Sequence, residues 1–100
     1  MAIRMNAELV APRRMKGRDQ ADQLLSALPD RLDGVVVRLD VPDGALPTPS
    51  FLDQLVEIVL LARGAERLVV ARASDFTASI LEASAVDHGV ADQVEFIGPA

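Results

Sequence analysis

Cysteine is absent from the chain, which therefore forms no disulfide and offers no thiolate as a nucleophile or metal ligand. Aromatic residues are scarce: three phenylalanines, with no tryptophan or tyrosine, leave no stacking platform for single-stranded nucleic acid. Long apolar runs are also missing, and none approaches the roughly 18 residues that a membrane-spanning helix requires. Residues 1–4 lack the apolar region of a secretory signal. We expect a cytoplasmic protein without a membrane span.

Motifs that carry chemistry are equally scarce. The sequence has no glycine-rich phosphate loop, of either dinucleotide or P-loop type, and no glycine-flanked serine that would mark a nucleophile elbow. The single histidine, His88, falls in the last turn of a predicted helix, where the helix dipole favours a cation. Paired carboxylates such as Asp53 and Glu57 lie on polar helix faces, where solvation explains them. The sequence therefore predicts a protein that is not an enzyme, with no catalytic residue, metal or cofactor.

Positive charge is in the minority and is unevenly spread. The formal net charge is −5, which argues against a nucleic-acid binder because neutralising phosphates needs clustered cations. Cations nevertheless gather in residues 1–18, where Glu8 is the one acid. Two interpretations of this cluster stay open: a solvated loop before the first helix, or a contact for an anion or an acidic partner. The candidate anion-binding residues are Arg13, Arg14, Lys16 and Arg18.

The first part of the chain predicts a strand, a helix and a second strand. Apolar and polar residues alternate over residues 3–11, which indicates a half-buried strand. Apolar residues then recur at helical spacing over residues 21–28, and a proline ends that helix. Residues 35–41 form a near-continuous apolar run, typical of a central strand in a sheet with crossover connections. Arg38 and Asp40 project from the same side of this strand, and we expect them to pair on an exposed sheet face.

The rest of the chain continues to alternate between helix and strand. The predicted elements are a helix over residues 51–63 followed by Gly64, a strand over residues 68–71, a helix from Ser74 or Asp75 to His88, and a strand over residues 94–97. The order β-α-β-α-β-α-β contains no linker or repeat, so residues 1–100 are expected to form one domain. Right-handed crossovers then give an α/β fold with a four-stranded, largely parallel sheet and helices mainly on one face.

The junction at residues 46–53 is the most informative stretch of the chain. It ends a buried strand and opens an apolar helix, so it lies at the carboxyl edge of a parallel sheet, where open α/β sheets usually keep their working residues. Ser50 and, three residues later, Asp53 form a capping-box arrangement. The Ser50 hydroxyl is therefore predicted to accept a backbone N–H at the helix start, at the positive end of the helix dipole.

The helix over residues 51–63 is apolar almost all round. The apolar residues that would face the core are sufficient without Leu60 and Leu61. These two leucines lie one turn beyond the polar residues of the helix, on the same side. A helix of this kind is either fully buried or covered by something else. Both interpretations stay open: the chain's own ends cover the extra apolar side chains, or a partner does.

These residues resemble a known family. Residues 48–55, with the sequence Thr-Pro-Ser-Phe-Leu-Asp-Gln-Leu, resemble the helix-opening motif of STAS-like domains, the group typified by bacterial anti-sigma factor antagonists. The Ser-Phe pair followed by an acid looks closest to the uncharacterised STAS-like subfamily. Residues 64–70 and 88–96 are similar in layout to that family's third strand, last helix and closing strand. The resemblance covers about residues 3–97.

The resemblance implies a protein partner, a histidine-kinase-like ATPase or an anti-sigma factor, that phosphorylates a serine at the start of the second helix. Ser50 is the matching position, and Thr48 is the nearby alternative. The chain has Thr-Pro-Ser-Phe at residues 48–51 where the family has Asp-Ser-Ser-Gly, so an acceptor aligned with Pro49 would have no hydroxyl. The expected partner-binding residues are Thr48, Ser50, Phe51, Asp53, Gln54, Glu57, Leu61, Ser74 and Asp75.

Three functional hypotheses follow. The preferred one is a regulatory protein–protein interaction module in a partner-switching pathway, with phosphorylation at the start of the second helix. The second is a scaffold or assembly subunit that has lost the switch and docks through Leu60 and Leu61. The third is a small-anion or nucleotide-binding domain that uses the cations of residues 13–18. The sequence leaves the oligomeric state open.

Overall fold

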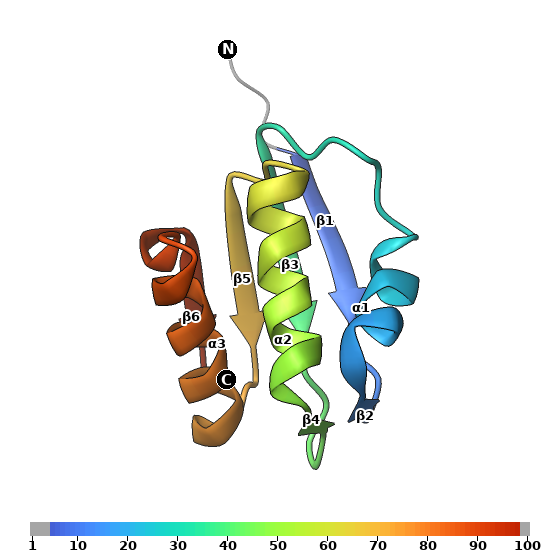
Figure 1. The fold of residues 1–100 in the computed structure, drawn as a ribbon, viewed down its shortest axis with the longest axis vertical. Coiled ribbons are helices and arrows are strands. Elements are labelled where there is room, and N and C mark those ends of the chain that lie inside the picture. Colours follow the sequence, from blue (N-terminus) through green and yellow to red (C-terminus); the bar gives the residue numbers. More distant parts are fainter. Residues whose placement is uncertain (1–4, 99–100) are drawn as a thin grey trace.

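The main sheet of the molecule is four-stranded and entirely parallel. A computed structural model describes residues 5–98 (Figure 1) and places the strands in the order β1-β3-β5-β6. The strands are β1 (Met5–Val10), β3 (Val35–Asp40), β5 (Arg67–Ala71) and β6 (Val94–Ile97). This confirms the predicted α/β class and the strand positions, although the predicted first strand began at Ile3, and Ile3 and Arg4 lie outside the described residues.

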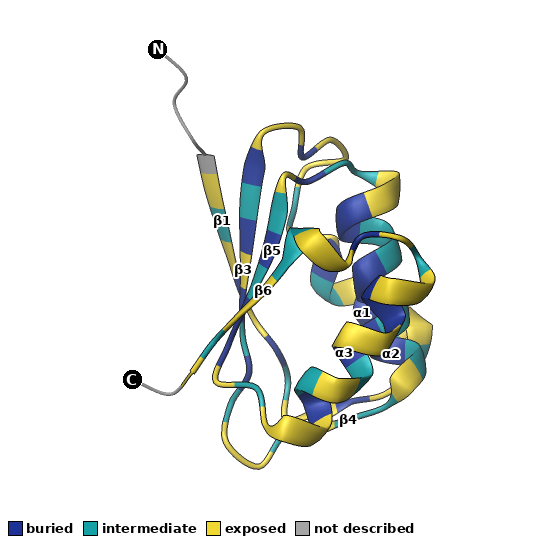
Figure 2. Cartoon of the chain, turned by 90° about the vertical axis from the view of Figure 1, so that its left-hand side faces the viewer, coloured by how far each residue is buried: buried dark blue, intermediate teal, exposed yellow. Residues whose placement is uncertain are grey.

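All of the long helices cover one face of this sheet. Figure 2 shows the sheet on one side of the molecule and the helices on the other, with buried residues concentrated where the two layers meet. The opposite face of the sheet carries no helix within residues 5–98. The helices are α1 (Gly17–Leu25), α2 (Pro49–Val56) with its continuation η1 (Glu57–Ala62), α3 (Asp75–Asp87) and the short η2 (Ala91–Gln93).

The core lies between the two layers. On the sheet side, alternate residues of β3 and β5 such as Val37 and Val70 are fully buried, as a half-covered strand requires. On the helix side, Phe51 and Leu55 of α2 have no exposed surface. The middle helix α2 is therefore anchored firmly against the central strands, and its other side is available for polar contacts with α1 and α3.

A small second sheet joins the loops that precede α1 and α2. Strand β2 (Arg14–Met15) pairs in parallel with β4 (Leu46–Pro47), and the Met15 side chain is fully buried. The backbone N–H of Thr48 donates to the carbonyl of Met15 over 2.8 Å. Strands of two residues are too short to show an alternation of apolar and polar residues, so the hydrophobic pattern did not predict this small sheet. This sheet holds the N-termini of α1 and α2 side by side.

The second half of the long central helix is π-helical. In η1 the backbone N–H of Arg63 donates to the carbonyl of Ile58, five residues earlier, over 2.9 Å. Within η1, Leu60 is buried at 5% exposure, while Leu61 is 48% exposed. Leu60 is thus covered by the chain itself, and Leu61 alone remains for a partner. Gly64 follows the end of η1 with φ +72°, as predicted for a helix-ending glycine.

The remaining boundaries differ from the predictions by a few residues. Helix α1 begins at Gly17 and ends at Leu25, earlier at both ends than the predicted 21–28, because the apolar spacing marks its buried face rather than its termini. Helix α3 begins after Ser74 and has His88 as its C-terminal cap residue, as expected. Among residues 5–98, no helix has both the length and the apolar character needed to cross a bilayer.

Candidate functional site

The start of α2 is capped by Thr48 and not by Ser50. The Thr48 Oγ1 atom accepts the backbone N–H of Phe51 over 3.3 Å and that of Gly17 over 2.9 Å. Pro49 occupies the first helical position, which its fixed φ suits, so the helix starts before Ser50 and the cap falls one residue before the proline. The predicted capping box of Ser50 and Asp53 is therefore wrong.

Ser50 lies in the first turn of α2 with a hydroxyl that has no capping role. Its Oγ atom lies 3.3 Å from Thr48 Oγ1, and the residue is half-buried. From the sequence, both the helix cap and the candidate phosphorylation site were assigned to Ser50, whereas in the structure the cap belongs to Thr48. Thr48 stabilises the helix start, and Ser50 presents a hydroxyl beside it.

This division predicts different stabilities for two matched variants. We expect Thr48→Ala to lower the free energy of unfolding by about 1–2 kcal/mol, because both the Phe51 and the Gly17 N–H lose their acceptor. We expect Ser50→Ala to change it by about 0.5 kcal/mol or less. Urea unfolding of the two variants measures the difference, and Thr48→Ser, which keeps the hydroxyl, should stay close to wild type. Equal losses from both alanine variants would contradict this assignment of the cap.

A hollow of about 470 Å³ opens between the N-terminal part of α2 and the exposed side of α3. Ser50 lies on its α2 wall, and Ile80 and Ala83 supply apolar surface on its α3 wall. Phe76, one turn before Ile80 on α3, is 65% exposed. The complete lining consists of Arg18, Pro49, Ser50, Asp53, Ile80, Ala83, Ser84 and Asp87.

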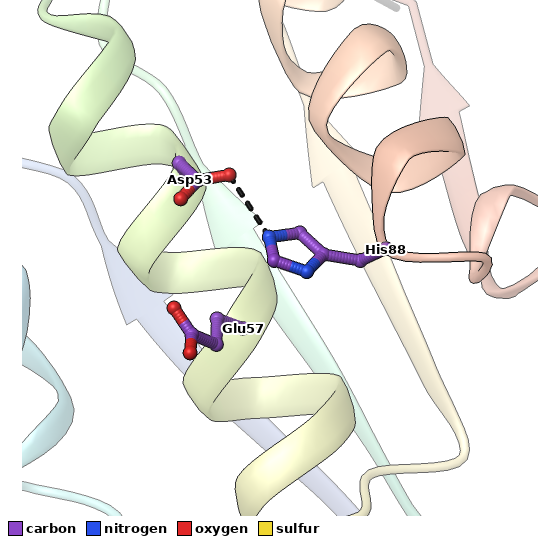
Figure 3. A group of neighbouring side chains, drawn as sticks. All are labelled: Asp53, Glu57 and His88. Atoms are coloured by element: carbon purple, nitrogen blue, oxygen red, sulfur yellow. Dashed lines mark hydrogen bonds and ion pairs between the residues drawn. The ribbon is translucent and has the colours of Figure 1, made fainter.

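Asp53 is the polar centre beside this hollow. Its Oδ1 accepts the Ser84 hydroxyl over 2.8 Å and the His88 Nε2–H over 2.9 Å, and its Oδ2 accepts Arg18 Nη2 over 2.9 Å. Figure 3 shows the imidazole of His88 reaching across from α3 to this carboxylate on α2. Burial opposes ionisation of the carboxyl, yet hydrogen bonds from Ser84, Arg18 and His88 hold the pKa of Asp53 below its ordinary value. The carboxylate therefore ties three helices together.

Two further side chains of the central helix, one from α2 and one from η1, extend this network toward α1. Gln54 Oε1 accepts Arg18 Nη1 over 2.8 Å, and Gln54 Nε2 donates to Asp22 Oδ1 over 2.9 Å. Glu57 Oε2 lies 3.7 Å from Arg18 Nη1. Asp53, Gln54 and Glu57, predicted as partner contacts, do lie together, but these hydrogen bonds and ion pairs are made with neighbouring helices of the same chain.

Ser84, Asp53 and His88 are close together but do not have the geometry of a catalytic triad. In a triad the histidine lies between the other two and takes the serine proton, whereas here Asp53 lies in the middle. The Ser84 hydroxyl donates to the carboxylate, and the residue is buried at 7% exposure. The arrangement orients side chains and does not activate a nucleophile.

No family model matches this chain, and the curated proteins and the solved structures give no match either. Its function is therefore inferred from the site's own geometry.

Several predicted site residues lie elsewhere. Phe51 is fully buried, so its assignment as a partner contact is wrong: the earlier helix start turns this ring toward the sheet. Leu61 is exposed but lies at the far end of the helix from Ser50. Ser74 caps α3 by accepting the Thr77 N–H over 3.1 Å and lines a separate hollow of about 310 Å³ beyond the ends of β3 and β5. Asp75 follows it as an exposed residue in the first turn of α3.

The cations of residues 13–18 do not form a single patch. Arg18 is directed to the carboxylate of Asp53 and the amide of Gln54. Arg13, Arg14 and Lys16 are exposed around the small strand β2 and the turn that follows it. Arg18 is therefore engaged within the chain, and for the exposed Arg13, Arg14 and Lys16 both the solvated loop and the anion contact stay predictions.

Asp40 pairs with Arg72 and not with Arg38. The Arg72 Nε and Nη2 atoms donate to the two carboxylate oxygens over 2.8 and 3.0 Å. The register explains this, because Asp40 faces Ala71 and Arg72 follows immediately, with a φ of 64°. The hydrogen bonds from Arg72 outweigh desolvation and lower the pKa of Asp40, while the same contacts raise the pKa of Arg72. Arg38 contributes only a weaker electrostatic attraction to Asp40, so the predicted Arg38–Asp40 pair is wrong: a strand neighbour two residues away is less well placed than the arginine that directly follows the adjacent strand.

Proposed function

We propose that this protein is a regulatory protein–protein interaction module similar to STAS-like anti-sigma factor antagonists, and that it binds its partner through the hollow between α2 and α3. The observation that carries the proposal is the position of Ser50, whose residue lines that hollow and has no part in capping the helix. A hydroxyl so placed can be modified without removing a support of the fold. The resemblance of residues 48–55 to the STAS helix-opening motif points to the same residue.

The chemistry of the hollow suits a protein surface as its ligand. Ile80 and Ala83 supply apolar contact area, and Phe76 continues it along α3. Arg18 and Asp53 form a polar border on the other side. An apolar centre with a charged border is the usual anatomy of a specific protein interface. The proposed partner is a histidine-kinase-like ATPase or an anti-sigma factor, as the resemblance implies.

Phosphorylation of Ser50 would change this surface while leaving the fold intact. A phosphate carries about −1.5 to −2 charges at neutral pH, and the N-terminal turn of a helix favours an anion. On the surface of the hollow, the same group would stand near the Asp53 carboxylate and at the place where the partner docks. Thr48 is the poorer acceptor, because its hydroxyl is already bonded to two backbone N–H groups. The phosphorylated form is therefore expected to fold and to release its partner.

A binding experiment with matched charge variants tests the proposal. A photo-reactive amino acid at Ala83 would identify the protein that docks in the hollow, and the purified pair would then be measured by calorimetry. We expect Ser50→Asp to weaken binding by about tenfold or more while the thermal unfolding midpoint stays close to wild type. Ser79→Asp is the control, because Ser79 is exposed on α3 and does not line the hollow. A Ser50→Asp protein that binds as tightly as wild type would overturn the switch.

The non-switching scaffold remains a second candidate because Leu61 is 48% exposed at the end of η1. Leu60 has no part in it, since that side chain is buried. In this case Leu61→Glu would abolish docking, whereas Ser50→Asp would have no effect on it. The same calorimetric measurement therefore distinguishes the two candidates.

A further inference from the structure

Two carboxylates and the single imidazole of the chain converge at the boundary between α2 and α3. Asp53 and Glu57 lie four residues apart, on the same side of the central helix, and His88 reaches them from the C-terminal cap of α3 (Figure 3). One donor atom from each of the three residues lies within 4.8 Å of the other two. The side chains of Asp53, Glu57 and His88 are 31%, 47% and 24% exposed, so the group is open to solvent on one side.

The spacing of two of these three atoms already matches what a small divalent ion requires. Zinc binds imidazole nitrogen and carboxylate oxygen at about 2.0–2.2 Å, so two such ligands on one ion lie roughly 2.9–3.5 Å apart. His88 Nε2 and Asp53 Oδ1 already lie 2.9 Å apart, joined by the imidazole proton. A metal ion that replaces this proton needs little movement of either side chain. Glu57 has to close a gap of at most 4.8 Å, which a rotation of its flexible and half-exposed side chain allows.

The charge of the group also favours a cation. Asp53 and Glu57 carry two negative charges when ionised, and the guanidinium of Arg18 is the cation that faces both, at 2.9 Å from Asp53 and 3.7 Å from Glu57. Arg18 is itself 49% exposed and can turn away into water. The Ser84 hydroxyl, which donates to Asp53 Oδ1, would remain as the outer contact that orients the ligand carboxylate.

We propose that Asp53, Glu57 and His88 form a binding site for a divalent transition-metal cation, with Zn²⁺ as the probe. A mixed set of one imidazole and two carboxylates suits borderline ions of this kind better than Mg²⁺ or Ca²⁺, which prefer oxygen ligands alone. Three protein ligands leave at least one coordination position for water. Arg18 competes with the ion, so the site is regulated by the position of this one side chain. The proposal does not rest on the proposed function, although Asp53 and Arg18 also border the hollow.

Calorimetric titration of the tag-free protein with ZnCl₂ tests the site. We expect one ion per chain, and we expect His88→Gln and Glu57→Gln each to weaken binding by tenfold or more. We expect Arg18→Gln to strengthen it several-fold, because the competing cation is gone. Asp87→Asn is the matched control: it removes the same charge as Glu57→Gln from an exposed neighbour of His88 and should leave the affinity within about twofold.

The single histidine provides a second, structural measurement. Because His88 is the only histidine, its imidazole nitrogen signals in an NMR spectrum are assigned without ambiguity, and Zn²⁺ should shift the Nε2 signal strongly. Absence of one-site binding in both wild type and Arg18→Gln would overturn the proposal. Binding that His88→Gln and Glu57→Gln weaken no more than Asp87→Asn would also overturn it, since the ion would then be held by general surface charge.

Discussion

Replacing Phe51 by alanine should lower the free energy of unfolding by about 3–5 kcal/mol. The ring is fully buried in the core between α2 and the sheet, so its removal loses apolar burial and leaves a cavity that close-packed neighbours fill only in part. Because the free energy of unfolding of a small domain is about 5–15 kcal/mol in total, the predicted loss is a large share of the stability of the protein. Thermal unfolding should shift down by roughly 12 °C or more, at about 4–8 °C for each kcal/mol.

Phe76→Ala is the matched control for this prediction. It removes the same ring from a position that is 65% exposed on α3, and we expect a change of about 0.5 kcal/mol or less. The two variants should separate stability from binding: Phe76→Ala is expected to weaken binding at the proposed docking surface in a stable protein, whereas Phe51→Ala is expected to lower stability. A stable Phe51→Ala protein would mean that this ring is a surface contact after all.

Replacing Asp53 by alanine should lower the free energy of unfolding by about 2–3 kcal/mol. The buried Ser84 hydroxyl, His88 and Arg18 all lose their acceptor, and a buried polar group without a partner costs about 1–3 kcal/mol. The ion pair with the half-exposed Arg18 adds little, since water screens it. Asp53→Asn keeps an oxygen for Ser84 and should lose less than the alanine variant. Urea unfolding in the presence of EDTA measures both variants without bound metal.

The contribution of Asp53 should also depend on pH. Arg18 of α1, His88 of α3 and Glu57 one turn further along face this carboxylate, and its folded-state pKa lies below the ordinary value of 3.8. A carboxyl group whose pKa is lower in the folded state than in the unfolded state stabilises the fold when the pH is above its unfolded-state pKa. This stabilisation is lost as the pH falls through its folded-state pKa. The stability difference between wild type and Asp53→Asn should therefore shrink as the pH falls below about 4. Asp92→Asn, at an exposed acid of η2, is the control.

The hydrophobic pattern predicted the fold well because each of its elements has a clear period. Residues 35–41 are apolar almost without interruption, and β3 is indeed a central strand buried among its neighbours. The helix after Pro49 and the strand at residues 68–71 were likewise predicted from the spacing of their apolar residues. The two-residue strands β2 and β4 have no period of their own, so nothing local indicated them.

The contacts of the candidate site were harder to predict. Asp53 and His88 are far apart in the sequence, and only the packing of α2 beside α3 brings them to 2.9 Å. One signal was present: a carboxylate in the middle of an apolar helix needs a partner when it is partly buried. The correct cap was also readable, since a threonine directly before a proline matches the preference for proline at the first helical position. Thr48 was therefore a predictable cap, whereas the pairing of Asp40 with Arg72 depended on a strand register that the sequence does not specify.

The wholly parallel sheet has a consequence for how the chain reaches its native state. No two neighbouring strands are joined by a hairpin: Met5 pairs with Val35, Val36 with Arg67, and Leu68 with Val94. Every strand pair must therefore close a long loop before it gains any contact, and a complete helix has to be placed in the same step. Folding should be slow for a domain of this length, on the order of milliseconds to seconds, and nearly all-or-none. During synthesis, β3 therefore has no strand to pair with on the side that β5 later occupies until residues 67–71 have left the ribosome.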